Sequence, residues 1–489
     1  MNILFASSEA IPFARTGGLA DVSASLPVAL ERLGQNVAVV IPAYKSVFES
    51  GLSLKDTGVR FPVPIGEGTM AARIWKGHVP DSDVPIYFVQ QDHYFKRNEL
   101  YTEYGSDYND NSERFIFFSR AVMEMISVMN LKVDILHSND WQTGIIPAMQ
   151  SILYQEKPGY ENIATIHTIH NLAYQGIFWH WDLNLTGIGW EHFTFDKLEF
   201  YGKLNLMKAG IVFADGITTV SPQYALEIQS PAFGYGLEGV LQCRSPMLRG
   251  ILNGACLQRW NPEIDPYIAA QYNAENVFEK KPICKRDLQE TLGLAQRSNA
   301  PLFGVVSRFA HQKGIDLITE VIPLWVEKHG VQFCLLGKGD RHLEARLSAL
   351  ASQYPENVAV RFDFSDELSH KIEAGSDLFI MPSRYEPCGL NQMYSQIYGT
   401  VPLVRDTGGL ADTVVDLNDD TLEHGTATGF AFSSDDIHGL NTTIWRALDV
   451  YWHRRNVWNQ LIVNGMRQDW SWAKSAVQYV RFYEKLVRK

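Results

Sequence analysis

Short apolar runs alternate with longer amphipathic stretches along most of the chain. In the first half the apolar runs predict strands at Ile3–Ala6, Val37–Ile41, Pro85–Val89, Val133–Leu136, Ile163–Ile166 and Gly216–Val220. The stretches between them predict helices, among them Gly18–Leu33, Ser112–Met129 and Trp141–Gln155. This alternation is typical of βαβ units around a buried parallel sheet.

The pattern weakens where proline and glycine become frequent, between about residues 225 and 300, and then restarts. The second set of predicted strands is Leu302–Val306, Val331–Leu336, Val358–Val360, Leu378–Met381 and Pro402–Val404, with helices such as Ile315–Lys328 and Arg341–Gln353 between them. We therefore expect two α/β domains, over residues 1–250 and 251–469. The tail from Trp452 to Lys489 contains no further predicted strand, so we expect it to pack on the existing domains.

Composition excludes some classes of protein. With 43 Lys and Arg against 55 Asp and Glu, the net charge of −12 argues against a generally cationic nucleic-acid-binding surface. Five scattered cysteines without a CxxC pair indicate neither a disulfide framework nor a zinc cluster. The chain shows no signal-peptide pattern and no apolar run long enough to span a membrane, so we expect a cytoplasmic protein without a membrane partner.

A glycine pair occurs twice, because Thr16–Asp21 has the same six residues as Thr407–Asp412. Each copy follows a predicted strand or strand-like run and opens a predicted helix. Glycine pairs are common in tight turns, so a purely local role is one interpretation. The alternative is that each domain presents this turn to a ligand, with backbone N–H groups at the helix start facing an anion. Arg15 adds a positive charge beside the first copy.

Two further loops follow predicted strands and carry charge. Arg308 and Lys313 lie in such a loop just before a predicted helix, where cations oppose the helix dipole. An anion such as a phosphate between them would explain the pairing; an ordinary surface loop is the alternative. Glu386 lies on a turn stiffened by Pro387 and Gly389, and its alternative role is to stabilise a helix N-terminus.

Asp140 and His170 also follow predicted strands, so the candidate residues converge on post-strand turns of both domains. A single loop histidine is more often structural than catalytic. Aromatic residues gather at Tyr94, at Tyr174 and over 178–181. They are either core residues or rings that stack on sugars.

Six segments, taken together and in this order, resemble the bacterial glycogen synthase and plant starch synthase family: RTGGLADV from Arg15, YNDNSERFIFFSRA from Tyr108, HNLAYQG from His170, SRFAHQKGID from Ser307, SRYEPCGLNQ from Ser383 and TGGLADTV from Thr407. The matches cover nearly the whole chain. The resemblance implies the GT-B architecture, in which two Rossmann-like domains face a deep cleft and a C-terminal helix, here 470–489, returns to the first domain. It also implies retaining, metal-independent transfer of glucose from ADP-glucose to the non-reducing 4-OH of an α-1,4-glucan such as glycogen or a maltooligosaccharide, with no cofactor.

The resemblance also implies roles for individual residues. The catalytic set it implies is Glu386, His170, Arg308, Lys313 and Asp140. The donor-binding residues it implies are Arg15, Gly17, Gly18, Asn253, Phe364, Gly389, Leu390, Asn391, Thr407, Gly408 and Gly409. Candidate acceptor-binding residues are Asp21, Tyr94 and Tyr174. No metal ligand is expected.

Four of the family's usual motifs are altered: Arg15 replaces a lysine, Asn139 and Gln142 replace two histidines of HxHDWH, Cys256 ends an altered NGVD, and Asn391 replaces a threonine. Two alternative functions therefore stay open. One is a transferase that uses UDP-glucose or another acceptor, and another is a non-catalytic glucan-binding protein. Oligomeric state, regulation and acceptor length are not indicated by the sequence.

Overall fold

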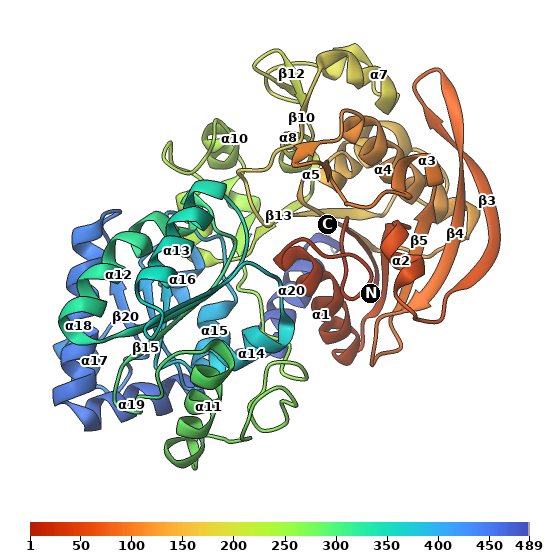
Figure 1. The fold of residues 1–489 in the computed structure, drawn as a ribbon. Helices are drawn as coiled ribbons and strands as arrows, with labels where there is room; N and C mark the ends of the chain where they lie inside the picture. The colour runs from red at the N-terminus through yellow and green to blue at the C-terminus, as the bar shows by residue number, and fades with distance from the viewer. Residues whose placement is uncertain (488–489) are drawn as a thin grey trace. The chain divides into compact units, whose positions relative to one another are not determined.

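The computed structural model describes residues 1–487 and divides into two compact units. Unit 1 comprises Met1–Gly254 together with the segment from Trp472 onward, and unit 2 comprises Ala255–Ser471. The boundaries predicted from the sequence lie at 250 and 469. Each unit is an α/β structure with its own sheet (Figure 1).

Unit 1 contains a nine-stranded sheet in the order β14-β13-β9-β8-β1-β2-β5-β4-β3. The strands are β1 (Asn2–Ala6), β2 (Asn36–Pro42), β3 (Lys55–Ile65), β4 (Gly68–His78), β5 (Pro85–Gln90), β8 (Ile135–Asn139), β9 (Ala164–Ile169), β13 (Gly216–Thr219) and β14 (Leu248–Gly250). All pairings from β14 to β5 are parallel. The six strands predicted for this half are confirmed.

The expectation of a parallel sheet is wrong at one edge, where β3 and β4 form an antiparallel hairpin on β5. Pro62 and Pro64 lie within β3, and proline is unfavourable in a central strand because it cannot donate to the sheet. The residue pattern of this segment therefore did not predict a strand. β3 tolerates both prolines because it is the outermost strand.

The helices of unit 1 include the two long predicted ones, α1 (Gly18–Arg32) and α4 (Asn111–Val128). The single helix predicted over Trp141–Gln155 is instead broken into α5 (Asp140–Thr143), α6 (Ile146–Met149) and a wider helical turn at Gln150–Tyr154. Pro147 lacks an N–H and cannot continue the hydrogen-bond ladder from α5. The shorter helices are α2 (Lys45–Glu49), α3 (Asp92–Phe95), α7 (Leu183–Thr186), α8 (Leu206–Phe213), α9 (Pro222–Glu227) and α10 (Glu238–Cys243).

The final helix, α20 (Trp472–Val487), belongs to unit 1, as the resemblance implies. Its apolar face joins the core of that unit and lies against α1. The Tyr483 hydroxyl lies 2.7 Å from His137 Nδ1 on β8, and Ser475 Oγ donates to the Leu252 carbonyl at 2.5 Å. Residues 488 and 489 of the predicted segment lie outside the described residues.

Unit 2 contains a six-stranded parallel sheet in the order β17-β16-β15-β18-β19-β20. The strands are β15 (Leu302–Val306), β16 (Gln332–Leu336), β17 (Val358–Arg361), β18 (Leu378–Met381), β19 (Val401–Arg405) and β20 (Phe430–Phe432). The helices are α11 (Val277–Leu292), α12 (Ile315–His329), α13 (Arg341–Gln353), α14 (Asp366–Gly375), α15 (Asn391–Ile397), α16 (Gly408–Thr413), α17 (Asp419–Glu423), α18 (Ile437–His453) and α19 (Arg455–Met466). The five predicted strands are confirmed, and β20 was not predicted.

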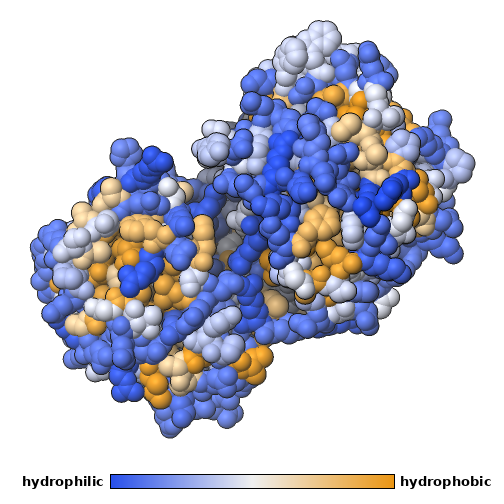
Figure 2. Space-filling view, turned by 45° about the vertical axis from the view of Figure 1, so that its right-hand side comes forward, coloured by the Kyte–Doolittle hydropathy of each residue, from blue (hydrophilic) through white to orange (hydrophobic). Residues whose placement is uncertain are grey.

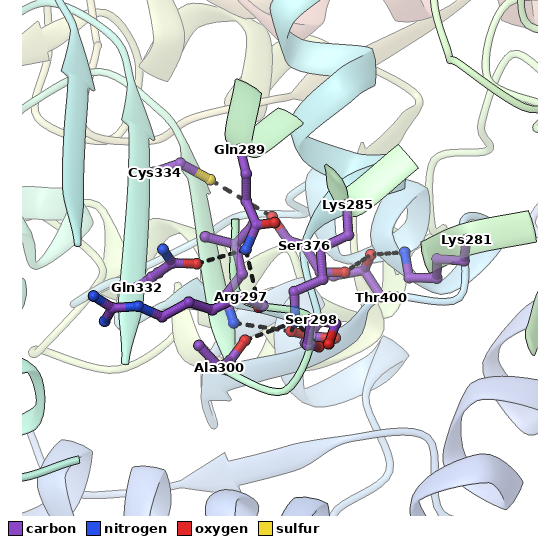
Figure 3. Close-up of polar contacts among 12 residues, drawn as sticks. Lys281, Lys285, Gln289, Arg297, Ser298, Ala300, Gln332, Cys334, Ser376 and Thr400 are labelled. Atoms are coloured by element: carbon purple, nitrogen blue, oxygen red, sulfur yellow. Dashed lines mark hydrogen bonds and ion pairs between the residues drawn. The ribbon is translucent and has the colours of Figure 1, made fainter. Parts of the chain in front are cut away.

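Two buried lysines fasten α11 to the rest of unit 2 (Figure 3). Lys281 Nζ donates to Thr400 Oγ1 at 2.6 Å and to backbone carbonyls, while Lys285 Nζ lies 2.6 Å from Asp377 Oδ2. Burial lowers the pKa of Lys281 to about 8. Each ammonium is surrounded by acceptors, so this cluster is a structural anchor.

Each sheet has a point where the chain changes the direction in which it adds strands. In unit 1 the chain runs from β1 outward through β2 and β5, then returns to place β8 on the other side of β1. In unit 2 the same reversal separates β15 from β18. Loops after such neighbouring strands diverge and leave a crevice where ligands bind in open α/β sheets. The predicted residues Asp140, Arg308 and Glu386 follow three of these four strands.

The face drawn in Figure 2 is largely hydrophilic, with separate hydrophobic patches. Exposed aromatic side chains on unit 1 include Trp179, Trp181 and Trp190, and the Trp181 ring contacts each of the other two. That the aromatic residues over 178–181 stack on sugars stays a prediction. Within residues 1–487, no helix combines the length and apolar character needed to cross a membrane.

Candidate active site

In unit 2, the loops that follow β15 and β18 bring Lys313 and Glu386 together. Lys313 ends the short turn after β15, and Glu386 lies in the loop after β18. Their side chains form an ion pair, with Nζ 2.5 Å from Oε2. Ser383 Oγ donates to the same carboxylate oxygen at 3.0 Å. The cation predicted to need an anion thus has one from its own chain, and Glu386 is buried.

The two loops are also fastened to each other away from this ion pair. The Arg384 N–H donates to the Gln312 carbonyl at 2.8 Å, and its guanidinium makes two 2.8 Å contacts with Asp316 on α12. Such a bidentate pair fixes geometry as well as charge. Arg308 is exposed at the rim of the loop, where its Nη2 lies 3.4 Å from Gln312 Oε1. Its guanidinium is therefore accessible to a ligand.

Gly314 offers a stability test of this loop. It caps α12 at φ +66°, and a Cβ there would come 2.2 Å from the Pro382 carbonyl oxygen. Gly330 ends the same helix at φ +62°, with its nearest obstacle 4.0 Å away. Gly314→Ala is expected to lower the free energy of unfolding by about 3 kcal/mol or more, and Gly330→Ala by about 1 kcal/mol, because only the former adds a steric clash to the backbone strain. Urea denaturation measures both, and equal losses would contradict the close packing of the two loops.

The second glycine pair positions the Glu386 loop. Thr407 precedes α16, and Gly408 at φ +46° lies so close that a Cβ would be 2.0 Å from the Glu386 carbonyl oxygen. The Gly409 N–H donates to that same oxygen at 3.0 Å. This N–H is therefore engaged by the protein, and a direct donor contact through it is not supported.

The remaining donor candidates of unit 2 lie on two other loops. Gly389, at φ +69°, and Leu390 precede α15, and Asn391 begins it. Asn391 Nδ2 donates to the Val306 carbonyl at 2.6 Å, so this amide ties α15 to the end of β15. Phe364 lies between β17 and α14 and is 72% exposed, with the Lys338 ammonium 5.8 Å from its ring centre.

In unit 1, Asp140 and His170 are brought together at the ends of β8 and β9. Asp140 adopts φ +53°, an uncommon conformation for a residue other than glycine. Its Oδ1 accepts hydrogen bonds from the N–H groups of His170 at 2.7 Å and Asn171 at 3.3 Å. Burial raises the pKa of Asp140 to about 7, and the nearby Glu9 charge adds to the rise. Burial lowers the pKa of His170 to about 3, so its ring stays neutral.

The raised pKa of Asp140 predicts a pH dependence of stability. The folded state binds this proton up to about pH 7, whereas the unfolded chain releases it near pH 4. The free energy of unfolding is therefore expected to decrease between about pH 4 and 7. In Asp140→Asn this decrease should be smaller by a few kcal/mol, because asparagine does not titrate. Asparagine keeps an acceptor oxygen and tolerates positive φ. Urea denaturation at pH 5 and pH 7.5 tests this, and parallel pH profiles for both proteins would contradict it.

The loop after β1 is organised by Glu9, which the sequence analysis did not single out. Its carboxylate accepts hydrogen bonds from the Thr16 N–H (2.5 Å), the Thr16 hydroxyl (2.5 Å), the Gly17 N–H (3.3 Å) and the Tyr101 hydroxyl (2.6 Å). Burial raises the pKa of Glu9. The predicted anion site at this helix start thus already holds a carboxylate of the chain. The Gly17 N–H already donates to Glu9 at 3.3 Å, and the expectations that Gly17 and Gly18 offer their N–H groups to a phosphate stay predictions.

The other candidates of unit 1 differ in accessibility. Arg15 and Asp21 form an ion pair, with Nη2 3.7 Å from Oδ2. Tyr174 is 48% exposed, as an acceptor-binding ring requires. Tyr94 is fully buried among core aromatics and its hydroxyl contacts Glu113, so the expectation that it binds an acceptor is wrong. Asn253 is buried, and its Oδ1 has no hydrogen-bond partner among the described residues.

Comparison with known proteins places this architecture in a family. Residues 2–243 match the starch synthase catalytic domain, and residues 293–460 match the glycosyl transferases group 1 domain. The chain is 43% identical over its full length to glycogen synthase 1 of Geobacter metallireducens, of which it covers 97%, and 44% identical to the glycogen synthase of Syntrophotalea carbinolica, of which it covers 99%. The chain belongs to the glycogen and starch synthase family.

Membership of the glycogen and starch synthase family makes the chain a glycosyltransferase. Among solved structures, the catalytic domain of Arabidopsis thaliana starch synthase IV, bound to ADP and acarbose, is 34% identical with a TM-score of 0.91, and the match covers 100% of this chain and 99% of that one. Sucrose-phosphate synthase from Thermosynechococcus elongatus, at 18% identity and a TM-score of 0.61, shares the fold. The predicted GT-B fold class is confirmed.

Proposed function

We propose that this chain is a glycogen synthase that transfers glucose from ADP-glucose to the non-reducing 4-OH of an α-1,4-glucan, with retention at the anomeric carbon and without a metal. The observation that carries this proposal is full-length similarity to proteins named glycogen synthase. The ADP and acarbose bound to the similar starch synthase IV domain support a nucleotide donor and a glucan-like acceptor.

The proposed role of unit 2 is to stabilise the departing diphosphate. When the bond between the anomeric carbon and the diphosphate oxygen breaks, negative charge develops on the phosphate, and fixed positive charge lowers the barrier. Arg308 offers an exposed guanidinium and Lys313 an ammonium already held by Glu386. We propose that a bound diphosphate shares Lys313 with Glu386. These two cations supply the charge that a metal supplies in other transferases.

The proposed role of unit 1 lies at the sugar. His170 is neutral and suits a hydrogen bond to a donor hydroxyl, while Asp140 orients the turn that carries it. Retention by a covalent intermediate requires a nucleophilic carboxylate, and retaining glycosidases hold two carboxyl groups about 5 Å apart. We instead propose front-face attack, in which the acceptor 4-OH forms the new bond on the face that the diphosphate leaves. The acceptor proton then passes to the departing diphosphate.

Further contacts complete the proposal. Phe364 stacks on the adenine, Arg15, Gly18 and Asn253 contact the donor, and Tyr174 and Asp21 contact the acceptor. Gly389, Leu390 and Asn391 form the donor side of the α15 turn. Thr407 and Gly408 support Glu386 from the second glycine turn.

The test measures ADP release from ADP-glucose with and without glycogen, in buffer containing EDTA. Release that requires glycogen, together with a new α-1,4 linkage detected by NMR, is expected. A preference for UDP-glucose would overturn the donor assignment, and loss of activity in EDTA would overturn the metal-free mechanism. No release from either donor would point to a glucan-binding protein.

A further inference from the structure

Asn139 and His170 form a buried pair between neighbouring parallel strands of unit 1. Asn139 is the last residue of β8 and lies opposite Thr168 of β9, while His170 directly follows β9. Asn139 is fully buried and His170 is 9% exposed. The Nε2 atom of His170 lies 2.9 Å from Oδ1 of Asn139, which is hydrogen-bond distance.

The direction of this hydrogen bond follows from a third group. Asn139 Nδ2 lies 3.0 Å from the carbonyl oxygen of Ala6 at the end of β1. A carbonyl oxygen only accepts, so the Asn139 amide must turn its NH₂ toward Ala6 and its oxygen toward His170. An amide oxygen also only accepts. Nε2 of His170 must therefore carry the proton.

A neutral imidazole carries one proton, so a proton on Nε2 leaves a lone pair on Nδ1. The ring is neutral because burial lowers the pKa of His170 to about 3. Within residues 1–487, no hydrogen bond involves Nδ1. This nitrogen is thus left as an acceptor for a group that is not part of the described chain.

We propose that Asn139 is a positioning residue, which fixes neutral His170 in the Nε2–H tautomer so that Nδ1 accepts a hydrogen bond from a hydroxyl of the donor sugar. The identity of the ligand rests on the proposed function, whereas the tautomer follows from the hydrogen bonds of Asn139 and the burial of His170. A histidine at position 139, as in the usual HxHDWH motif, presents either a donor or an acceptor to its neighbour. Asparagine, held by Ala6, presents only an acceptor. The replacement of histidine by asparagine at position 139 therefore leaves His170 with a single favoured tautomer.

The tautomer is tested by NMR on the full chain labelled with ¹⁵N-histidine, because protonated and unprotonated ring nitrogens resonate far apart. His170→Gln identifies the His170 signals. Asn139→Leu removes the acceptor, leaving Nε2–H buried without a partner, so the proton is expected to move to Nδ1. Ser138→Ala is the matched control and should leave the His170 signals unchanged. It removes a buried hydroxyl of the same strand, which donates to the Ile166 carbonyl at 3.1 Å and lies 2.9 Å from His167 Nδ1.

The consequence for catalysis is tested with ADP-glucose and its monodeoxy analogues. Asn139→Leu is expected to lower kcat/KM for ADP-glucose about tenfold, the scale of one lost hydrogen bond. One deoxy analogue should be a poorer substrate for the wild type but show no such penalty with Asn139→Leu, a coupling that general loosening of the fold does not produce.

Two results would overturn the proposal: a proton on Nδ1 in the wild type, or an unchanged Nε2–H signal in Asn139→Leu. A switched tautomer with unchanged kcat/KM would overturn the sugar contact. Absence of any ADP release by the wild type would overturn the proposed function instead, and the NMR result separates the two failures.

Discussion

Replacing Lys313 by alanine is expected to lower kcat about 100-fold or more, the scale for losing one group that stabilises developing charge. The ammonium lies 2.5 Å from Glu386 and at the end of the turn that leads into α12. Its removal takes away a fixed positive charge and also leaves the buried Glu386 carboxylate without its cation. Arg308→Ala is expected to show a loss of similar size, because its guanidinium is exposed and can meet a phosphate directly.

The measurement is single-turnover and steady-state ADP release at saturating ADP-glucose and glycogen. Lys328→Ala is the matched control, because Lys328 is exposed to solvent in the last turn of α12, the helix that follows Lys313. It should retain wild-type kcat, and circular dichroism should show that all three variants are folded. Turnover near the wild-type value in both Lys313→Ala and Arg308→Ala would remove these residues from the catalytic set.

Much of the fold follows from local signals in the sequence. Strands such as Leu378–Met381 and helices such as Arg341–Gln353 were predicted with their observed bounds, because apolar runs and amphipathic periods report burial directly. The β3–β4 hairpin escaped because β3 is an edge strand that contains two prolines. β20 was missed because three residues are too short to give a pattern.

The candidate site residues were predictable where a polar or charged side chain directly follows a strand. Lys313, Glu386, Asp140 and His170 were predicted on post-strand turns, and the structure pairs them as Lys313 with Glu386 and Asp140 with His170. The partners could not be predicted, because they depend on which strands become neighbours. Glu9 is such a case, since nothing local shows that its carboxylate will accept four hydrogen bonds from Thr16, Gly17 and Tyr101.

For Tyr94 the role predicted from the sequence was wrong. An aromatic residue near a loop suits both a core and a sugar platform, and composition does not separate these roles. The ring packs on Phe95 and Phe117 and is fully buried, so burial decides against the platform. A net charge of −12 likewise says little about a site where Arg308 and Lys313 concentrate positive charge.

Glu386→Gln is expected to lower kcat about 100-fold or more, which corresponds to about 2.7 kcal/mol in the barrier, while the protein stays folded. Glutamine has the same shape and can still accept from Ser383, so packing against Gly408 is kept. What changes is charge: Lys313 loses the carboxylate that holds its ammonium in place. A freed ammonium binds a phosphate in more than one geometry, so catalysis is expected to fall more than donor affinity.

The matched control is Glu356→Gln, which neutralises an exposed carboxylate of the same unit that pairs with Arg297 at 2.6 Å. Exposed ion pairs contribute about 1 kcal/mol or less, so this variant should retain both stability and kcat. The decisive comparison is kcat against the dissociation constant for ADP, measured by calorimetry. If Glu386→Gln turns over like the wild type, Glu386 acts as a structural carboxylate in the loop before α15, and the charge that guides Lys313 must come from the substrate alone.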